Sequence, residues 1–221
     1  MRSAVTALAS GGLDSCVMLG ELAKSYQEVY PVFVRCGLRW EENELVALQD
    51  FVDALHQERI RPIRELHFPM NDVYGSNWYT GGEAVPAYHD PDQVWEIPGR
   101  NLILISKTAV WCKLHQVEAI AIGVLRSNPF SDATPEFFEY LQHTLRQSLQ
   151  FDMSLLRPLA GLHKSDVIKL GRSFPLELTL SCANPFGKIH CGVCGKCRER
   201  IDAFAKANIS DPTRYHQHFA D

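Results

Sequence analysis

The chain has 221 residues, of which 46% are hydrophobic, and its 22 basic and 26 acidic side chains give a formal net charge of −4. This length suits one domain, or one domain with a small addition, and the hydrophobic content is sufficient for a sizeable core. The absence of a basic excess argues against a non-specific nucleic-acid coat, so no direct nucleic-acid partner is expected.

The first ten residues superficially resemble a secretory signal, with Arg2 followed by a short apolar run. That run ends at Ser10 and is shorter than the roughly 18 residues that a membrane span needs. We therefore predict a buried strand here and no membrane partner. The chain has 7 cysteines, an odd number, with four of them close together near the C-terminus. This distribution disfavours a disulfide framework and suits a reducing cytoplasm.

Apolar runs and helical periodicities alternate along the chain. They predict strands at residues 3–9, 28–36, 60–66, 117–123 and 155–159, and helices at residues 13–24, 41–55, 101–114, 135–149, 165–171 and 197–207. The stretch 69–99 lacks periodicity and is predicted to be a functional loop, such as a lid. The alternation predicts an α/β fold, a parallel sheet with helices on both faces. Ligands bind at the carboxyl ends of such strands, which places the turns after Ala9, Cys36 and Gly123 at the active site.

The turn after the first predicted strand has the composition of a phosphate-binding loop. Its residues are Ser10, Gly11, Gly12, Leu13, Asp14 and Ser15. Paired glycines let a backbone approach a ligand closely, and the free amides of the following helix face the turn. No Gly-Lys-Ser/Thr follows, so this is not a Walker loop. A plain strand-to-helix turn is the alternative, and Asp14 has two candidate roles, in supporting magnesium or in capping the helix.

Four cysteines near the C-terminus have the spacing of a metal site. Cys182, Cys191, Cys194 and Cys197 are arranged as C-x8-C-x2-C-x2-C. Four thiolates make a closed tetrahedral zinc site, which is usually structural; an iron–sulfur cluster is the competing interpretation. We interpret the adjacent His190 as an exposed neighbour. The zinc is expected to pin a C-terminal segment, residues 176–221, against an ATP-binding domain at residues 1–175.

The Ser-Gly-Gly-x-Asp-Ser run resembles the signature of the PP-loop ATP pyrophosphatases. The resemblance implies an adenine-nucleotide alpha hydrolase-like (Rossmann-like) domain that cleaves ATP between its α and β phosphates. It also implies that the loop from Ser10 to Ser15 holds the pyrophosphate with Mg²⁺. Within that superfamily, further segments resemble the 7-cyano-7-deazaguanine synthases. These are residues 97–101, 135–137, 162–171 and 178–182, together with the cysteine cluster.

This closer resemblance implies a carbon–nitrogen ligase of queuosine biosynthesis, which uses ATP and ammonia to convert 7-carboxy-7-deazaguanine into its nitrile. Its cofactors would be ATP, Mg²⁺ and Zn²⁺. The family pattern implies that Arg100 and Lys164 act with Asp14, facing phosphate or carboxylate groups. For the acceptor base we predict Trp40 and Phe130 as apolar contacts, and Asp132 as the acceptor of guanine-like N–H groups.

Two segments depart from the family pattern, at residues 35–40 and 123–134. Three alternatives to the synthase therefore stay open. The first is a paralogue that transfers the adenylated acid to another amine, such as a protein amine. The second is a tRNA thiolation enzyme, for which Cys36 lies in a candidate active-site turn. The third is a non-catalytic zinc-ribbon binding module, against which the intact phosphate loop argues. The aromatic stretch 70–100 is a candidate surface for a homodimer.

Overall fold

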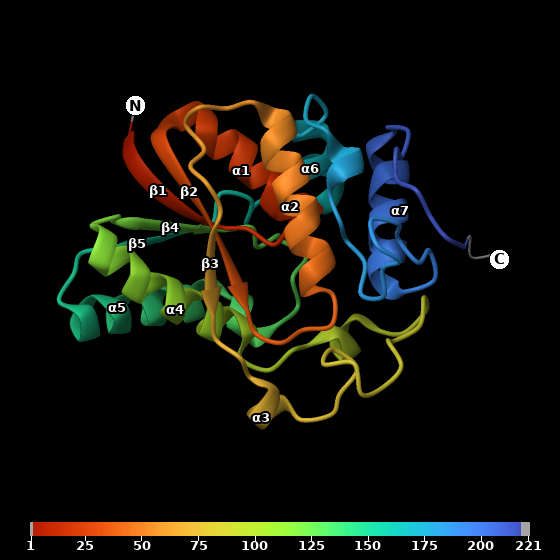
Figure 1. Ribbon diagram of the computed structural model, residues 1–221, viewed down its shortest axis with the longest axis horizontal. Coiled ribbons are helices and arrows are strands. Elements are labelled where there is room, and N and C mark those ends of the chain that lie inside the picture. The colour runs from red at the N-terminus through yellow and green to blue at the C-terminus, as the bar shows by residue number, and fades with distance from the viewer. Residues whose placement is uncertain (1, 218–221) are drawn as a thin grey trace.

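A computed structural model describes residues 2–217 (Figure 1). Its centre is a sheet of five parallel strands in the order β3-β2-β1-β4-β5. The strands are β1 (Arg2–Leu8), β2 (Tyr26–Arg35), β3 (Arg64–His67), β4 (Ala119–Ile122) and β5 (Ser154–Leu156). The central strands are nearly continuous apolar runs, which suits strands buried on both faces. In register, Leu8 of β1 lies between Val32 of β2 and Ile122 of β4.

Helices cover both faces of the sheet, which confirms the predicted α/β class. One face carries α1 (Leu13–Ser25), α2 (Glu41–Leu55) and α6 (Lys164–Leu170), and the other carries α4 (Arg100–His115) and α5 (Pro135–Leu149) (Figure 1). The last helix, α7 (Gly195–Ala207), packs along α6. Among the described residues, no helix is long and apolar enough to cross a membrane.

Two helices have the bounds predicted from the sequence, α2 and α5. At the start of α5 the hydroxyl of Thr134 accepts a hydrogen bond from the Phe137 amide at 3.2 Å, and Pro135 occupies the first turn. The third strand was predicted too early. It begins at Arg64, after Pro62, which has no amide to donate, and Ile60 makes only an isolated bridge to Val29.

The switch point of this strand order lies between β1 and β4, because the chain runs outward from β1 through β2 and β3 and then returns to β4. Open parallel sheets bind ligands in the crevice at that point, outside the carboxyl ends of the strands. Here the carboxyl ends are Leu8 of β1 and Ile122 of β4. The fold therefore places a ligand site directly against the glycine-rich turn.

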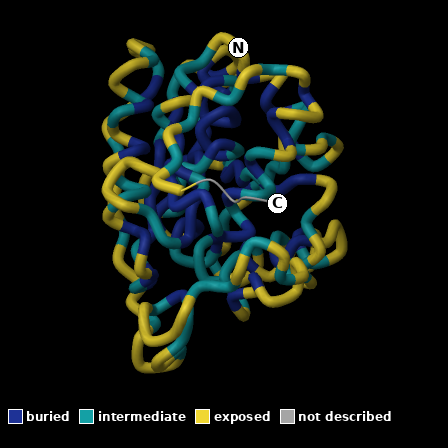
Figure 2. Tube along the Cα trace, turned by 90° about the vertical axis from the view of Figure 1, so that its right-hand side faces the viewer, coloured by how far each residue is buried: buried dark blue, intermediate teal, exposed yellow. Residues whose placement is uncertain are grey.

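The predicted loop at 69–99 crosses the carboxyl ends of the strands and contains two short helical turns, α3 (Asn71–Tyr74) and a 3₁₀ turn (Asp92–Trp95). Its far end is attached to the cysteine segment, since Ala87 bridges Cys194 and the Arg198 guanidinium donates to the Tyr88 carbonyl. Figure 2 shows the buried stretches in the middle of the molecule and the exposed ones along its rim. The loop is thus a wall built against the cysteine segment.

The boundary proposed at residues 175 and 176 does not divide the hydrophobic core. The four cysteines belong to the same buried cluster as Leu8 and Val32 of the sheet. The Leu180 amide also donates to the Gly11 carbonyl at 2.8 Å, which ties the C-terminal segment to the glycine-rich turn. The division into two domains stays a prediction, and its two parts share one core.

Candidate active site

The glycine-rich turn is shaped by its own serines. The Ser15 hydroxyl donates to the Gly12 carbonyl at 3.0 Å and accepts from the Ser10 amide at 3.1 Å, while the Ser10 hydroxyl accepts from the Gly12 amide at 3.3 Å. The N-cap of α1 is Gly12, which has no side chain to cap the helix, and the Leu13 amide donates to the Ser181 hydroxyl at 3.4 Å. Asp14 lies in the first turn and is not the N-cap. The turn has the geometry of an anion cradle.

Gly11 has a φ of +77°, and a Cβ placed on it would lie 2.2 Å from the Glu44 carbonyl oxygen. Gly11→Ala is therefore expected to distort the turn, to lower the free energy of unfolding by about 1–3 kcal/mol and to weaken ATP binding. Thermal unfolding and ATP titration measure the two effects. Gly161→Ala is the matched control, because a Cβ at Gly161 meets nothing within 4 Å. If the two variants had the same unfolding free energy and the same ATP affinity, the close approach of Gly11 to the Glu44 carbonyl would be contradicted.

A cavity of about 290 Å³ opens beside this turn, at the carboxyl ends of β1, β2 and β4. The three turns that the sequence analysis placed together do meet here, since Ala9, Cys36 and Gly123 all line it. Every predicted catalytic and substrate-binding residue also lines it: Asp14, Trp40, Arg100, Phe130, Asp132 and Lys164. The cavity combines a polar end at the glycine-rich turn with an apolar wall.

At the polar end, the Lys164 ammonium lies between two carboxylates. Its Nζ is 3.2 Å from Asp14 Oδ2 and 2.9 Å from Glu199 Oε2, and the lysine side chain is only 11% exposed. Burial works to lower the pKa of Lys164, but the two carboxylates outweigh it and raise the pKa above its ordinary value. Lys164 therefore stays charged at neutral pH, next to the turn that would hold an anion.

Two buried polar atoms in this cavity have no hydrogen-bond partner, Asp14 Oδ1 and Arg100 Nε. Within residues 2–217 they are the only buried side-chain nitrogen or oxygen atoms of this kind. Burying a polar group without a partner costs free energy, so such atoms are rare in folded proteins. Burial also raises the pKa of Asp14, against the opposing effect of Lys164. The cavity thus offers an acceptor without a donor and a donor without an acceptor.

The apolar wall is made of indole rings from two segments. Trp40 stacks on Trp78 with 5.7 Å between ring centroids, and Trp78 meets Trp95 edge-on at 5.1 Å. Trp40 and Trp95 are each 6% exposed, and all three tryptophans line the cavity. A flat ring fits such a wall by stacking and edge contacts.

Asp132 is engaged with the start of α4. Its Oδ2 accepts from the Asn101 amide at 2.9 Å, and its Oδ1 accepts from the Asn101 side-chain amide at 3.2 Å. These contacts fix the helix turn that carries Arg100. The use of Asp132 as an acceptor for a base stays a prediction, and a structural role is now visible beside it.

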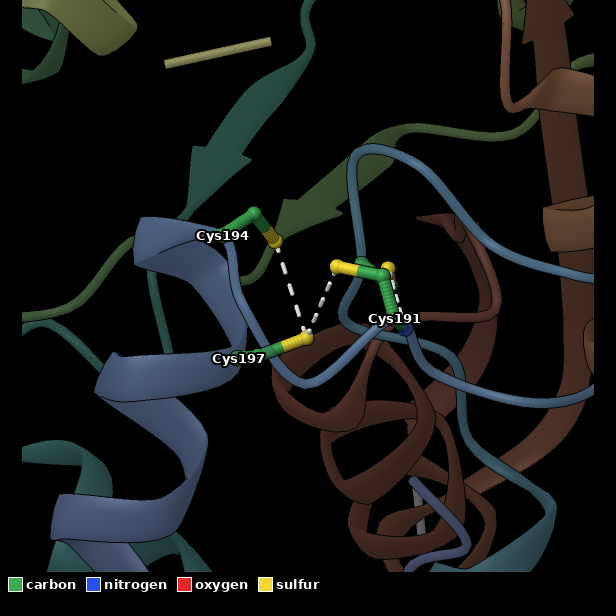
Figure 3. A group of neighbouring side chains, drawn as sticks. Cys191, Cys194 and Cys197 are labelled. Atoms are coloured by element: carbon green, nitrogen blue, oxygen red, sulfur yellow. Dashed lines mark hydrogen bonds between the residues drawn. The ribbon is translucent and has the colours of Figure 1, made fainter. Parts of the chain in front are cut away.

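The four cysteines converge near the start of α7, and Figure 3 shows three of them, Cys191, Cys194 and Cys197. All four are buried, and their sulfur atoms lie within 4.8 Å of one another. Two sulfurs also accept hydrogen bonds from backbone amides. Cys182 Sγ accepts from the Cys191 amide at 3.3 Å and from the Asn184 amide at 3.4 Å, and Cys197 Sγ accepts from the Gly192 amide at 3.4 Å. Amide donors favour the charged thiolate form that binds metals. The group can hold a metal ion.

The interpretation of His190 as an exposed neighbour was wrong. The ring is 2% exposed, and its Nε2 accepts the Ser181 amide at 2.9 Å. Burial lowers its pKa to about 3, with the nearby Arg200 acting in the same direction, so the ring is neutral. Arg200 is itself fully buried and donates to the Thr179 hydroxyl and the Leu176 carbonyl. Both side chains support the segment that carries the cysteines.

Several cavity residues were missed by the sequence analysis: Glu44, Trp78, Trp95 and Lys196. Trp78 and Trp95 belong to the non-periodic loop, where no pattern indicates which side chains turn inward. Lys196 lies between two predicted metal ligands, Cys194 and Cys197, and the cysteine pattern gives no indication of where a lysine within it points. Glu44 lies within an acidic run whose members can be distinguished only by their surroundings.

Residues 3–208 match the family model described as queuosine biosynthesis protein QueC. One similar relative is the 7-cyano-7-deazaguanine synthase of Methanothrix thermoacetophila, with 31% identity over 220 residues, covering 94% of this chain and 96% of that protein. Another is 7-cyano-7-deazaguanine synthase 1 of Desulfitobacterium hafniense, with 32% identity and 91% of each chain covered. A solved 4-thiouridine synthetase, in a complex with RNA and bound ATP, is similar in fold alone: its TM-score is 0.50 at 14% identity, with 96% of this chain and 47% of that chain covered.

Proposed function

The chain belongs to the QueC family of queuosine biosynthesis proteins, and from this premise we propose that it adenylates 7-carboxy-7-deazaguanine with ATP and aminates it with ammonia. Amination gives the amide, and a second ATP activates the amide oxygen, which leaves with AMP as the nitrile forms. The product is 7-cyano-7-deazaguanine, the compound in the names of its curated relatives, and AMP and pyrophosphate are released in both steps. The observation that carries the proposal is the pair of unpartnered buried atoms, Asp14 Oδ1 and Arg100 Nε, in one cavity.

Each unpartnered atom matches a group that this reaction brings. The buried carboxylate oxygen of Asp14 fits a hard cation, and Mg²⁺ takes one or two carboxylates together with phosphate oxygens. The buried guanidinium N–H of Arg100 fits an anion, either a phosphate or the carboxylate of the acid. When bound, Mg²⁺ would screen the charge of the phosphates.

In the first step, formation of the acyl adenylate, the residues of the cavity have separate roles. The glycine-rich turn from Ser10 to Ser15 holds the departing pyrophosphate, and Lys164 offsets its charge. Arg100 holds the acid so that its carboxylate oxygen attacks the α phosphorus, forming a carboxyl–phosphate bond while the bond to pyrophosphate breaks. Bringing two anions together is the main obstacle, and fixed cations in a water-poor cavity lower it. The three tryptophans place the flat base.

For the cysteine site we propose a single zinc ion with a structural role. A zinc–sulfur bond of about 2.3 Å puts tetrahedral ligands about 3.8 Å apart. The Sγ atoms of Cys191 and Cys197 are 3.8 Å apart, and those of Cys194 and Cys197 are 3.6 Å apart. An iron–sulfur cluster has a core of several atoms between its ligands, and would need wider separations. Because sulfur fills all four positions, no position is left for water or substrate.

The paralogue that uses a larger amine is the second candidate, and one observation favours it. A further hollow of about 560 Å³ adjoins the cavity, and Asp14, Lys164, Asn128 and Phe130 line both. An amine on a protein chain could reach the adenylate through it. Thiolation is less well supported, because burial raises the pKa of Cys36 to about 11 and the thiol is only 3% exposed.

We expect AMP and pyrophosphate in equal amounts when the enzyme is incubated with ATP, magnesium, ammonium and 7-carboxy-7-deazaguanine. Mass spectrometry of the same mixture identifies the product. The nitrile supports the synthase, whereas an amide or a protein adduct supports the paralogue. ADP as the stoichiometric product would refute the PP-loop chemistry. No consumption of the acid, by enzyme that cleaves ATP with another acid, would refute the base assignment.

A further inference from the structure

Three glutamates open α2, and each is differently engaged. Glu41 accepts the amides of Cys36 and Gly37 at 2.7 and 3.1 Å, so it fixes the turn after β2. Glu42 is an exposed partner of Arg35, at 2.6 Å. Glu44 lines the cavity. Glu41 lines it too, but the carboxylate of Glu41 is occupied by the two amides, and the reaction proposed above assigns no task to Glu44.

The position of Glu44 is fixed by backbone packing. Its carbonyl oxygen lies so close to Gly11 that a Cβ there would come within 2.2 Å, so the first turns of α2 abut the phosphate loop. Its carboxyl group is under the electrostatic influence of Arg100 and Lys196, which line the same cavity from α4 and α7. The carboxyl group therefore lies among the groups that would surround the reacting carbonyl.

We propose that the Glu44 carboxylate is the base that takes the proton of the attacking amine, an inference that rests on the proposed function. The amine nitrogen bonds to the carbonyl carbon of the acyl adenylate and passes one proton to a Glu44 oxygen. The bond from that carbon to the AMP oxygen then breaks, and its electron pair leaves with AMP. The products are the amide, AMP and a protonated Glu44, which returns its proton to solvent.

The surroundings of Glu44 suit this task. Burial raises its pKa to about 8, although Arg100 and Lys196 act in the opposite direction. A carboxylate with a raised pKa holds a proton more firmly than an ordinary one, and catalytic groups work best when their pKa lies near the operating pH. Within residues 2–217, Glu44 is bonded by the Trp40 side chain alone, whereas Glu41 accepts two backbone amides.

The test compares two reactions of one variant, Glu44→Gln. Acid-dependent exchange of pyrophosphate into ATP reports formation of the adenylate, and it should stay within about twofold of the wild-type rate. Product formation with ammonium should fall by about 10²–10⁴-fold, the usual contribution of a positioned base. Hydroxylamine is a stronger nucleophile, and its nitrogen, once bonded to the carbonyl carbon, is acidic enough to give its proton to water, so it should restore product formation to near the wild-type rate. Glu44→Asp keeps a carboxylate, so its rate of product formation with ammonium should lie between that of Glu44→Gln and that of the wild type.

Glu42→Gln is the matched control, since Glu42 lies on the same turn and faces solvent; all its rates should be unchanged. Loss of pyrophosphate exchange in folded Glu44→Gln would place Glu44 in ATP or magnesium binding and overturn the proposal. Full activity with ammonium, or a loss that hydroxylamine does not restore, would also overturn it. Absence of exchange in the wild-type enzyme would instead refute the proposed function, and the base assignment with it.

Discussion

Asp14→Asn is expected to lower the rate of ATP cleavage by about 10²–10³-fold, the usual cost of removing one charged group from a preorganised site. The change keeps the size of the side chain and removes the charge that faces the unpartnered position at Oδ1. Lys164 would keep its second partner, Glu199, at 2.9 Å, so the lysine should remain in place. The loss should therefore appear in turnover and in magnesium dependence, with little change in thermal unfolding.

Release of pyrophosphate at saturating ATP, measured across a magnesium titration, tests this expectation. Asp53→Asn provides the control: this exposed aspartate lies on α2 and accepts a hydrogen bond from Gln49, at 2.8 Å. Turnover in the Asp14 variant equal to that of the control would show that Asp14 does not act in the reaction. A loss of turnover in both Asp14→Asn and Asp53→Asn would instead point to an effect on folding.

The arrangement of the sheet could be predicted because its strands are short, apolar and separated by amphipathic helices. When strands and helices alternate along a chain, few topologies are possible, because each helix crosses over the sheet and brings the next strand in parallel to the last. The third strand was the exception. β3 is an edge strand whose side chains are mostly polar and exposed, so the range predicted at 60–66 overlaps the strand but misses its bounds. Local pattern predicts buried strands better than edges.

The site was predictable where chemistry fixes the spacing of neighbouring residues. The glycine-rich turn and the four cysteines are local motifs; the turn lines the cavity, and the four sulfur atoms lie within 4.8 Å of one another. Trp78, Trp95 and Glu44 were not predictable, because their roles depend on contacts between segments distant in sequence. His190 was misread for the same reason: its partner is the Ser181 amide, nine residues away, and no helical or strand period connects them.

Cys194→Ala is expected to cause the largest loss of stability. Zinc bound by thiolates contributes apparent free energies on the order of 10 kcal/mol in small zinc domains, and that energy is coupled to folding. The cysteine segment here shares its core with the sheet, so part of the loss reaches the whole protein. A fall of about 3 kcal/mol or more in unfolding free energy corresponds to about 10 °C in Tm for a chain of this size.

The loss of stability should also disturb the cavity beside the glycine-rich turn, because the cysteine segment contacts both of its walls. Cys194 bridges Ala87 of the long loop, the next residue, Gly195, packs against the Trp95 ring, and Leu180 binds the Gly11 carbonyl. Metal content, Tm and tryptophan fluorescence should therefore change together, both in Cys194→Ala and after treatment of the wild type with a chelator. Cys112→Ala removes a buried thiol outside the cluster and should leave the metal in place, at a cost of about 1 kcal/mol. Wild-type protein purified without metal but with unchanged Tm would rule out the structural role proposed for zinc.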